Sequence, residues 1–177
     1  ANPAMPKYAV RGVYSKEMLD FVPDIMREIG YKHAFVVYGE AGEGCMDEAS
    51  TIGTTWVAEL MENGDVKRYT LTPGEFGIEA GNPEELAPFG DIKETAKELV
   101  RILKGTSTPT RQNIVCLNAA LVLCVSGKAE NVQAGYIKSH ELIENGQAYK
   151  ALEKWVSVQN RNPEAGLAKL AALSAEL

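Results

Sequence analysis

The sequence predicts an α/β fold with a mostly parallel sheet flanked by helices, a β-hairpin and a helical C-terminal half. Two observations support this fold class. In the first half, short apolar runs that are typical of strands alternate with a run of helical periodicity, which is the order of a β-α-β unit. In the second half, from residue 91 onward, the apolar residues recur only at helical spacing.

The β-α-β unit is expected within the first 38 residues. A strand-like run occupies residues 7–14, and Ser15 can cap a helix over residues 16–29. This helix should end at Gly30. The next strand is expected at residues 33–38, and its almost wholly apolar sequence is typical of a strand that is covered on both faces.

A β-hairpin is predicted downstream. Residues 54–60 and 66–72 are rich in β-branched side chains, and the segment between them contains Asn63-Gly64. This dipeptide indicates a two-residue turn in which both residues take positive φ. Residues 73–88 are rich in Gly and Pro and are expected to form a loop.

The second half is predicted to be helical. Asp91 and Glu94 have the spacing of a capping box, with Asp in place of Ser. The helix that follows is expected to bury one stripe and to end at Gly105; the stripe consists of Ile92, Ala96, Leu99 and Leu103. Further helices are expected at residues 112–126, 131–145 and 147–158, and a last amphipathic helix carries Leu167, Leu170, Leu173 and Leu177.

Composition limits the class of protein. The 177 residues are 45% apolar and 24% charged, which is ordinary for a globular domain. No apolar run is long enough to span a bilayer, and Cys45, Cys116 and Cys124 lack the spacing of a metal site, so we expect a cytoplasmic protein without membrane contact. The net charge of −6 argues against a nucleic-acid partner, and it also requires a cation to mediate the binding of any anionic substrate.

Asp47 and Glu48 are the candidate metal ligands. They follow the glycine-rich stretch 39–46, after the predicted strand at 33–38. At the carboxyl end of a strand, neighbouring carboxylates can converge, and open α/β sheets bind ligands there. Hard carboxylate oxygens suit Mg²⁺, which in turn suits a phosphorylated substrate. The residues alone also allow a structural interpretation, in which Asp47 caps a turn and Glu48 is solvated.

No catalytic constellation is predicted elsewhere. His33 and His140 have no Cys, Ser or second His at a useful spacing, and both are interpreted as structural. Cys45 has no adjacent base and is interpreted as incidental. Hydroxyl groups follow the acidic pair, where they suit either phosphate oxygens or the entry to a strand; they belong to Ser50, Thr51, Thr54 and Thr55.

Several stretches occur in an informative order. They are Asn2-Pro3-Ala4, Gly12-Val13-Tyr14-Ser15, Val36-Val37-Tyr38-Gly39, Asp47-Glu48-Ala49-Ser50 with Gly53-Thr54-Thr55, Tyr69 through Pro73-Gly74-Glu75-Phe76-Gly77, Asn118-Ala119-Ala120 and Gly127-Lys128-Ala129. Taken together, over residues 1–158, these stretches resemble anthranilate phosphoribosyltransferases, a family related to the pyrimidine nucleoside phosphorylases. Two departures are a longer stretch between Gly39 and Asp47 and the presence of Tyr38 at a position that is often His.

The resemblance implies a function. Members of the family transfer the phosphoribosyl group from phosphoribosyl pyrophosphate to anthranilate, giving phosphoribosyl anthranilate and pyrophosphate in tryptophan biosynthesis. The resemblance implies that Asp47 and Glu48 bind the Mg²⁺ that holds the pyrophosphate, and that the enzyme is a homodimer. It also implies that residues 1–177 are the C-terminal portion of a larger domain, without the N-terminal helical domain and the first part of the sheet. Most substrate contacts would then lie in the absent half, and this portion alone would be inactive.

Two other functions remain open. A pyrimidine nucleoside phosphorylase-like enzyme would share the fold, although the Asp47-Glu48 pair disfavours it. A noncatalytic, nucleic-acid-binding relative of the same fold is disfavoured by the acidic charge balance.

Overall fold

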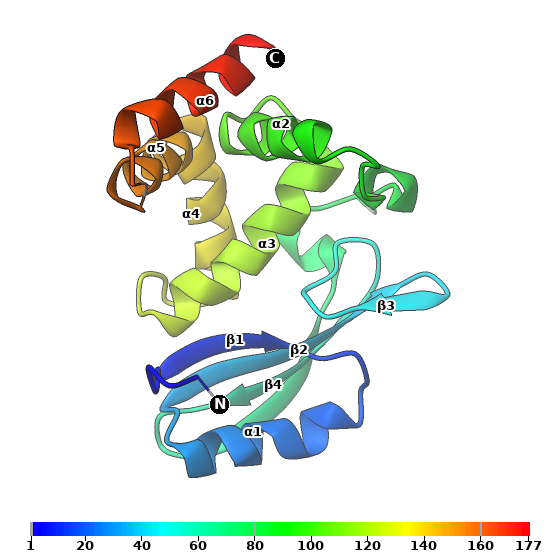
Figure 1. Cartoon of the computed structure of the whole chain (residues 1–177). Helices are drawn as coiled ribbons and strands as arrows, with labels where there is room; N and C mark the ends of the chain where they lie inside the picture. The colour runs from blue at the N-terminus through cyan, green and yellow to red at the C-terminus, as the bar shows by residue number, and fades with distance from the viewer. Residues whose placement is uncertain (1, 80, 160) are drawn as a thin grey trace.

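One mixed sheet lies between a single helix on one face and a layer of helices on the other (Figure 1). The computed structural model describes residues 2–79, 81–159 and 161–177. The strands are β1 (Tyr8–Gly12), β2 (His33–Ala41), β3 (Gly44–Met46), β4 (Thr55–Leu60) and β5 (Val66–Leu71). The helices are α1 (Met18–Ile29), α2 (Ile92–Leu103), α3 (Pro109–Val125), α4 (Val132–Glu144), α5 (Gln147–Gln159) and α6 (Pro163–Ala175), and two short 3₁₀ helices, η1 (Pro73–Phe76) and η2 (Pro83–Leu86), lie in the loop before α2.

The strand order is β1-β2-β4-β5, with β3 paired to β2 outside this path. The pair β1–β2 is parallel, and the pairs β2–β3, β2–β4 and β4–β5 are antiparallel. The expectation of a mostly parallel sheet is therefore wrong for the described residues. The reason is connectivity: a parallel pair needs a long crossover, which α1 provides between β1 and β2, whereas the later connections are short. The α/β class, the hairpin and the helical C-terminal half are confirmed.

The turn between β4 and β5 differs from its prediction. The hairpin forms, but within the described residues outside Gly the only positive φ is at Met5, so Asn63 does not share the left-handed conformation of Gly64, whose φ is 89°. The Asn63 side chain instead accepts a hydrogen bond from the backbone N–H of Asp65 at 3.0 Å. The Gly64 N–H donates to the Met61 carbonyl, which makes a longer turn with one left-handed glycine.

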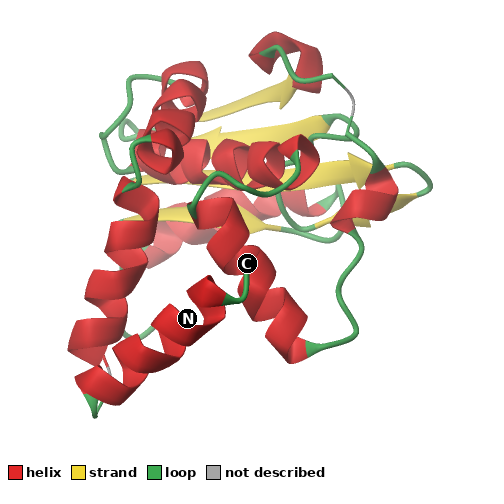
Figure 2. Ribbon diagram, turned by 90° about the horizontal axis from the view of Figure 1, so that it is seen from above, coloured by secondary structure: helices red, strands yellow, loops and turns green. Residues whose placement is uncertain are grey.

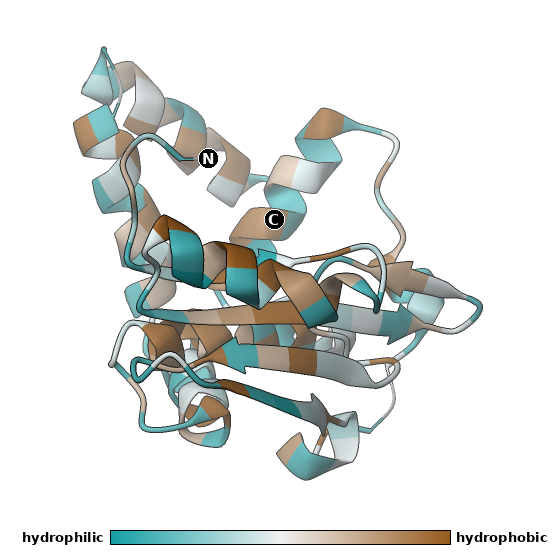
Figure 3. Ribbon diagram, turned by 90° about the horizontal axis from the view of Figure 1, so that it is seen from below, coloured by the Kyte–Doolittle hydropathy of each residue, from teal (hydrophilic) through white to brown (hydrophobic). Residues whose placement is uncertain are grey.

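Strand β2 divides the core into two layers. Phe35 and Val37 face the helical layer, where α3 and α4 pack, while Ala34 and Val36 face α1. All four side chains are excluded from solvent. This confirms the prediction of a strand covered on both faces, and Figure 3 shows α1 running alongside the strands on the lower face of the sheet.

Helix α2 buries a different face from the predicted one. Ile92 is 88% exposed and Leu99 is 50% exposed, whereas Glu98, Val100 and Ile102 are buried. The buried Glu98 carboxylate accepts hydrogen bonds from Arg101 and Ser107 and lies near Arg111, at 3.9 Å. The predicted stripe is therefore wrong for Ile92 and Leu99, whereas Ala96 and Leu103 are half-buried, because a compensated carboxylate occupies part of the packed face. Asp91 caps the helix through the Lys93 N–H, but Glu94 pairs with Lys97, so no capping box forms.

The C-terminal helices form a peripheral layer. Helix α6 packs against α5 and α2, and in the view from above the helix that ends at the C-terminus lies beside the strands and not over them (Figure 2). Among the described residues, no helix is long and apolar enough to cross a membrane.

Candidate metal centre

Asp47 and Glu48 lie on a bend directly after β3. The predicted strand end at residue 38 is too early, because β2 continues to Ala41 and forms a short antiparallel ribbon with β3. The ribbon extends away from the body of the molecule and then returns (Figure 1). Since Met46 pairs with Gly39, the acidic pair comes back to the carboxyl end of the parallel β1–β2 pair. The two residues are on a loop and not within a helix, as the sequence predicts.

Two glycines let this bend approach the strands closely. A Cβ atom at Gly12, the last residue of β1, would lie 1.4 Å from the Asp47 carbonyl oxygen. A Cβ atom at Gly39 would lie 2.4 Å from the Glu48 carbonyl oxygen. Both distances are far shorter than any real contact, so only glycine fits at either position while the bend stays in place. The backbone of the acidic pair is therefore pressed against the ends of β1 and β2.

Three polar side chains hold the chain on the far side of the bend. Asn118 on α3 accepts a hydrogen bond from the Ala49 N–H at 2.8 Å and donates to the Ala49 carbonyl at 2.9 Å. The Ser50 hydroxyl donates to the Glu40 carbonyl at 2.6 Å, and the Ser50 N–H donates to the Thr55 hydroxyl at 2.8 Å. Ala49, Ser50 and Thr55 are buried, so these bonds satisfy groups that water does not reach.

The carboxylates of Asp47 and Glu48 are by contrast uncompensated. Within the described residues neither makes a hydrogen bond or an ion pair. Both residues are exposed, yet protein atoms around the Glu48 carboxyl raise its pKa by desolvation, and the charge of Asp47 raises it further. Two adjacent hard-oxygen donors without a cationic partner fit a divalent cation that completes its shell with water and substrate oxygens. The described residues contain no cluster of three or more His, Cys, Asp or Glu side chains that could hold a metal by itself.

The hydroxyl groups that follow the acidic pair are mainly used inside the protein. Ser50 and Thr55 bond to the backbone and to each other, as described above. Thr51 is fully buried, and its hydroxyl is one of the side-chain polar atoms without a hydrogen-bond partner in the described part of the chain. Of the two alternatives for these residues, the structure favours the structural role over contacts with phosphate.

The histidines have packing roles, as predicted. His33 Nε2 lies 2.8 Å from Glu59 Oε1 in a partly buried pair. The His140 ring packs edge-on against Tyr136 at 4.7 Å between centroids, and burial lowers the pKa of His140. Cys45 is exposed on the ribbon and donates weakly to the Tyr14 carbonyl at 3.5 Å.

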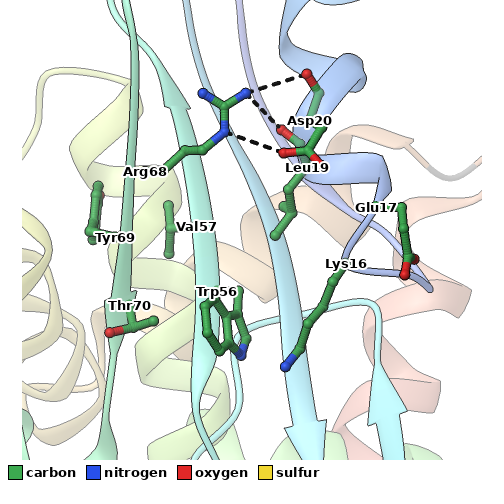
Figure 4. A pocket seen from close by; sticks show the side chains of 9 residues that line it. All are labelled: Lys16, Glu17, Leu19, Asp20, Trp56, Val57, Arg68, Tyr69 and Thr70. Carbon is green, nitrogen blue, oxygen red and sulfur yellow. Dashed lines mark hydrogen bonds and ion pairs between the residues drawn. The ribbon is translucent and has the colours of Figure 1, made fainter.

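A pocket of about 540 Å³ lies on the α1 side of the sheet, near the hairpin of β4 and β5 (Figure 4). Its cations already have partners. Lys16 pairs with Glu40 at 2.7 Å and lies 4.1 Å from the centre of the Trp56 ring. Arg68 lies 3.7 Å from the Asp20 carboxylate and donates to its carbonyl. Arg68 holds α1 to the sheet, and Lys16 joins the segment before α1 to β2, so both cations of the pocket are engaged within the protein.

Sequence reasoning found the acidic pair but missed the residues that position it. In the sequence Asn118 stands out only as part of a motif, although a polar amide inside the apolar run of α3 indicates a specific hydrogen-bond partner. No pattern in the sequence indicates that Gly12 faces Asp47, because the two residues meet only after the ribbon of β2 and β3 has formed.

Comparison with known proteins places the chain in a family. The glycosyl transferase family, a/b domain, matches residues 1–149. A protein named anthranilate phosphoribosyltransferase from Brucella canis is 37% identical over 163 residues, which are 92% of this chain and 46% of that protein. The chain therefore spans about half the length of the curated relatives it matches.

Solved structures give the same result. Anthranilate phosphoribosyltransferase from Thermus thermophilus superposes with a TM-score of 0.74 at 30% identity, covering 87% of this chain and 44% of that one. The enzyme of Saccharomyces cerevisiae, in complex with PRPP and Mg, superposes with a TM-score of 0.67 at 30% identity, covering 81% of this chain and 39% of that one. These matches confirm the resemblance that the sequence motifs indicate. The chain therefore belongs to the glycosyl transferase family, a/b domain.

Proposed function

We propose that the protein containing this chain transfers the phosphoribosyl group of phosphoribosyl pyrophosphate to the amine of anthranilate, releasing pyrophosphate. Within it, Asp47 and Glu48 hold Mg²⁺ for the pyrophosphate. The observation that carries this proposal is an uncompensated pair of carboxylates, fixed by its backbone at the carboxyl end of β1 and β2. It occurs in a chain that is 37% identical to proteins named for this reaction.

The chemistry of the residues agrees with this role. Mg²⁺ usually keeps several waters and binds proteins through one or two carboxylates together with substrate phosphates, so two protein ligands suffice. When bound, it would neutralise negative charge that develops on the leaving pyrophosphate. The displacement needs no protein nucleophile. Asp47 and Glu48 supply the oxygen atoms, and the packed backbone below them keeps these atoms in place.

The test is a charge-neutralising double substitution, Asp47→Asn with Glu48→Gln, in the full-length protein. We expect turnover to fall by about tenfold or more, and the concentration of Mg²⁺ for half-maximal rate to rise, because amide oxygens bind the ion without charge assistance. Loss of anthranilate fluorescence measures the rate across a Mg²⁺ series. Glu43→Gln is the matched control, since it removes a charge from the same exposed ribbon without touching the pair. An unaltered Mg²⁺ response in the double variant would reject the metal role.

The same assay separates the related activities. Product formation from anthranilate and phosphoribosyl pyrophosphate supports the proposal. Phosphorolysis of thymidine with inorganic phosphate, and no turnover of anthranilate, would instead support a pyrimidine nucleoside phosphorylase. Homodimer formation and a cytoplasmic location stay predictions.

We also propose that residues 1–177 are the C-terminal portion of the catalytic domain and require the rest of the protein as a partner. The chain offers two metal ligands, but a phosphate-bound Mg²⁺ is positioned only when the whole cleft is present. Among the strands that the structure describes, β1 also lies at an edge of the sheet, where it offers hydrogen-bonding groups to a further strand. Residues 1–177 alone should form no product, and mixing them with the remaining half should restore it. Activity of the isolated chain, free of host enzyme, would contradict this proposal.

A further inference from the structure

We propose that Asn118 is a positioning residue for the metal-binding bend: its side-chain amide anchors the backbone N–H and C=O of Ala49, the residue after Glu48, and so fixes where the two carboxylates lie. The inference rests on the proposed metal role of Asp47 and Glu48. Asn118 itself touches neither carboxylate in the hydrogen bonds that it forms, which all go to backbone atoms.

The geometry is that of a side-chain amide paired with both backbone polar groups of one residue. Asn118 Oδ1 accepts from the Ala49 N–H at 2.8 Å, and Asn118 Nδ2 donates to the Ala49 carbonyl at 2.9 Å. A third bond from Nδ2 reaches the Ile114 carbonyl, one turn earlier on α3, at 3.0 Å. This third bond holds the side chain in one orientation, so both bonds to Ala49 are made by a fixed group.

The anchor acts on a residue that no strand pairing holds in place. Ala49 is fully buried, and its backbone lies outside the strands, so no sheet partner satisfies its N–H and C=O. Gly12 and Gly39 lack the Cβ atoms that would collide with the bend, so they let the bend lie close to the strands. Asn118, which is 69 residues from Ala49 in the sequence, binds the backbone of Ala49 from helix α3. The bend is therefore held between the sheet and α3.

This placement bears on metal affinity. Mg²⁺ demands near-ideal octahedral geometry, so small displacements of its carboxylate ligands weaken binding strongly. Residues that orient metal ligands without touching the ion typically change affinity by about 10- to 100-fold when they are removed. We therefore expect Asn118 to act on Mg²⁺ affinity more than on the rate at saturating Mg²⁺.

The test uses the full-length protein with Asn118→Leu and Asn118→Ala. Leu keeps the branched shape and the number of side-chain heavy atoms and has a high helix propensity, so α3 should persist while all three hydrogen bonds are lost. The control is Asn113→Ala on the same helix, where Asn113 accepts a hydrogen bond from the Tyr136 hydroxyl at 2.9 Å. We expect the Mg²⁺ concentration for half-maximal rate to rise about tenfold or more in both Asn118 variants, with the rate recovering at high Mg²⁺. Asn113→Ala should lower the melting temperature without this rise.

Hydrogen exchange gives an independent readout that does not depend on the metal. Amide protection of the segment 47–50 should fall about tenfold or more in Asn118→Leu and stay unchanged in Asn113→Ala. Unchanged protection overturns the anchor. Lost protection with an unaltered Mg²⁺ response also overturns the inference, provided that the Asp47→Asn, Glu48→Gln variant does change that response. If the double variant leaves the response unaltered, the proposed metal role fails, whatever the exchange data show for the anchor.

Discussion

Strand β2 and the C-terminal helix pair α5–α6 differ sharply in how deeply they are buried. Four consecutive residues of β2, from Ala34 to Val37, are fully excluded from solvent. Of the residues of α5, all of which the structure describes, none is buried, and α6 buries Leu170 as its single core residue. Both regions are regular secondary structure, so the difference lies entirely in tertiary contacts.

The comparison shows which part of the molecule supports the candidate site. The buried strand leads directly to Gly39, against which Glu48 rests, and α3 covers the strand from one side. The α5–α6 pair reaches this part of the core through Ala148, which is only partly buried. Its other end is joined to α2 by ion pairs of Glu176, the residue after α6, with Lys93 and Lys97. The site should therefore depend on the sheet and α3, and remain when the outer helices loosen.

The largest expected effect comes from Phe35→Ala in the intact protein. Removing a fully buried ring should lower the free energy of unfolding by about 3–5 kcal/mol, because a cavity remains in the core. Leu170→Ala is the matched change in α6 and should reduce stability by about 2 kcal/mol, at the low end for such substitutions. Urea denaturation measures both.

Hydrogen exchange sharpens this prediction. In Leu170→Ala the increased exchange should be confined to α5 and α6, whereas in Phe35→Ala it should extend through the sheet and α3. Equal losses of stability, with exchange spread over the whole chain in both variants, would show that the two regions form one cooperative unit.

The smallest expected effect concerns surface ion pairs at the two regions. The Lys16 ammonium and the Trp56 N–H hold the pKa of Glu40 at about 2, below its usual value of 4.5. Because the folded-state pKa is the lower one, this stabilisation is fully present above pH 4.5 and is lost as the pH falls toward 2. Lys16→Met should return the Glu40 pKa toward 4.5 and lower stability at pH 7 by less than about 1 kcal/mol, since the pair is partly exposed.

Titration by NMR checks this change. Near α6, Lys93 and then Lys97 lower the pKa of Glu176, so Lys93→Met is the corresponding substitution there. Glu176 should respond less than Glu40, because Lys97 remains as a second partner. A Glu40 pKa that does not move in Lys16→Met would contradict the assignment of its cause.

The elements were largely predictable from local sequence, but their packing was not. Helix α2 occupies residues close to the predicted ones, yet the charged Glu98 lies on its buried face and Ile92 lies in solvent. Hydrophobic periodicity assumes that carboxylates face water; here Arg101 and Ser107 satisfy the carboxylate inside the fold. The parallel pairing was likewise overestimated, since hairpin-like connections impose antiparallel neighbours after β2.

Only the local part of the candidate site was predictable from the sequence. Asp47 and Glu48 stand out because adjacent acidic residues follow an apolar strand, which is a local pattern. Their support does not stand out, because Gly12 and Asn118 lie 35 and more residues away and meet the bend only through tertiary structure. Non-local contacts of this kind leave no periodic trace in the sequence.

The Asn118–Ala49 bridge also sets an order of events during folding. The β1-α1-β2 unit closes over short sequence distances, whereas the bridge needs a loop of 69 residues to close first. We expect the acidic bend to reach its final position only after α3 has docked on the sheet, so that a chain still maturing carries both carboxylates but not their arrangement. Competence for metal would then mark a late stage of folding rather than an early one.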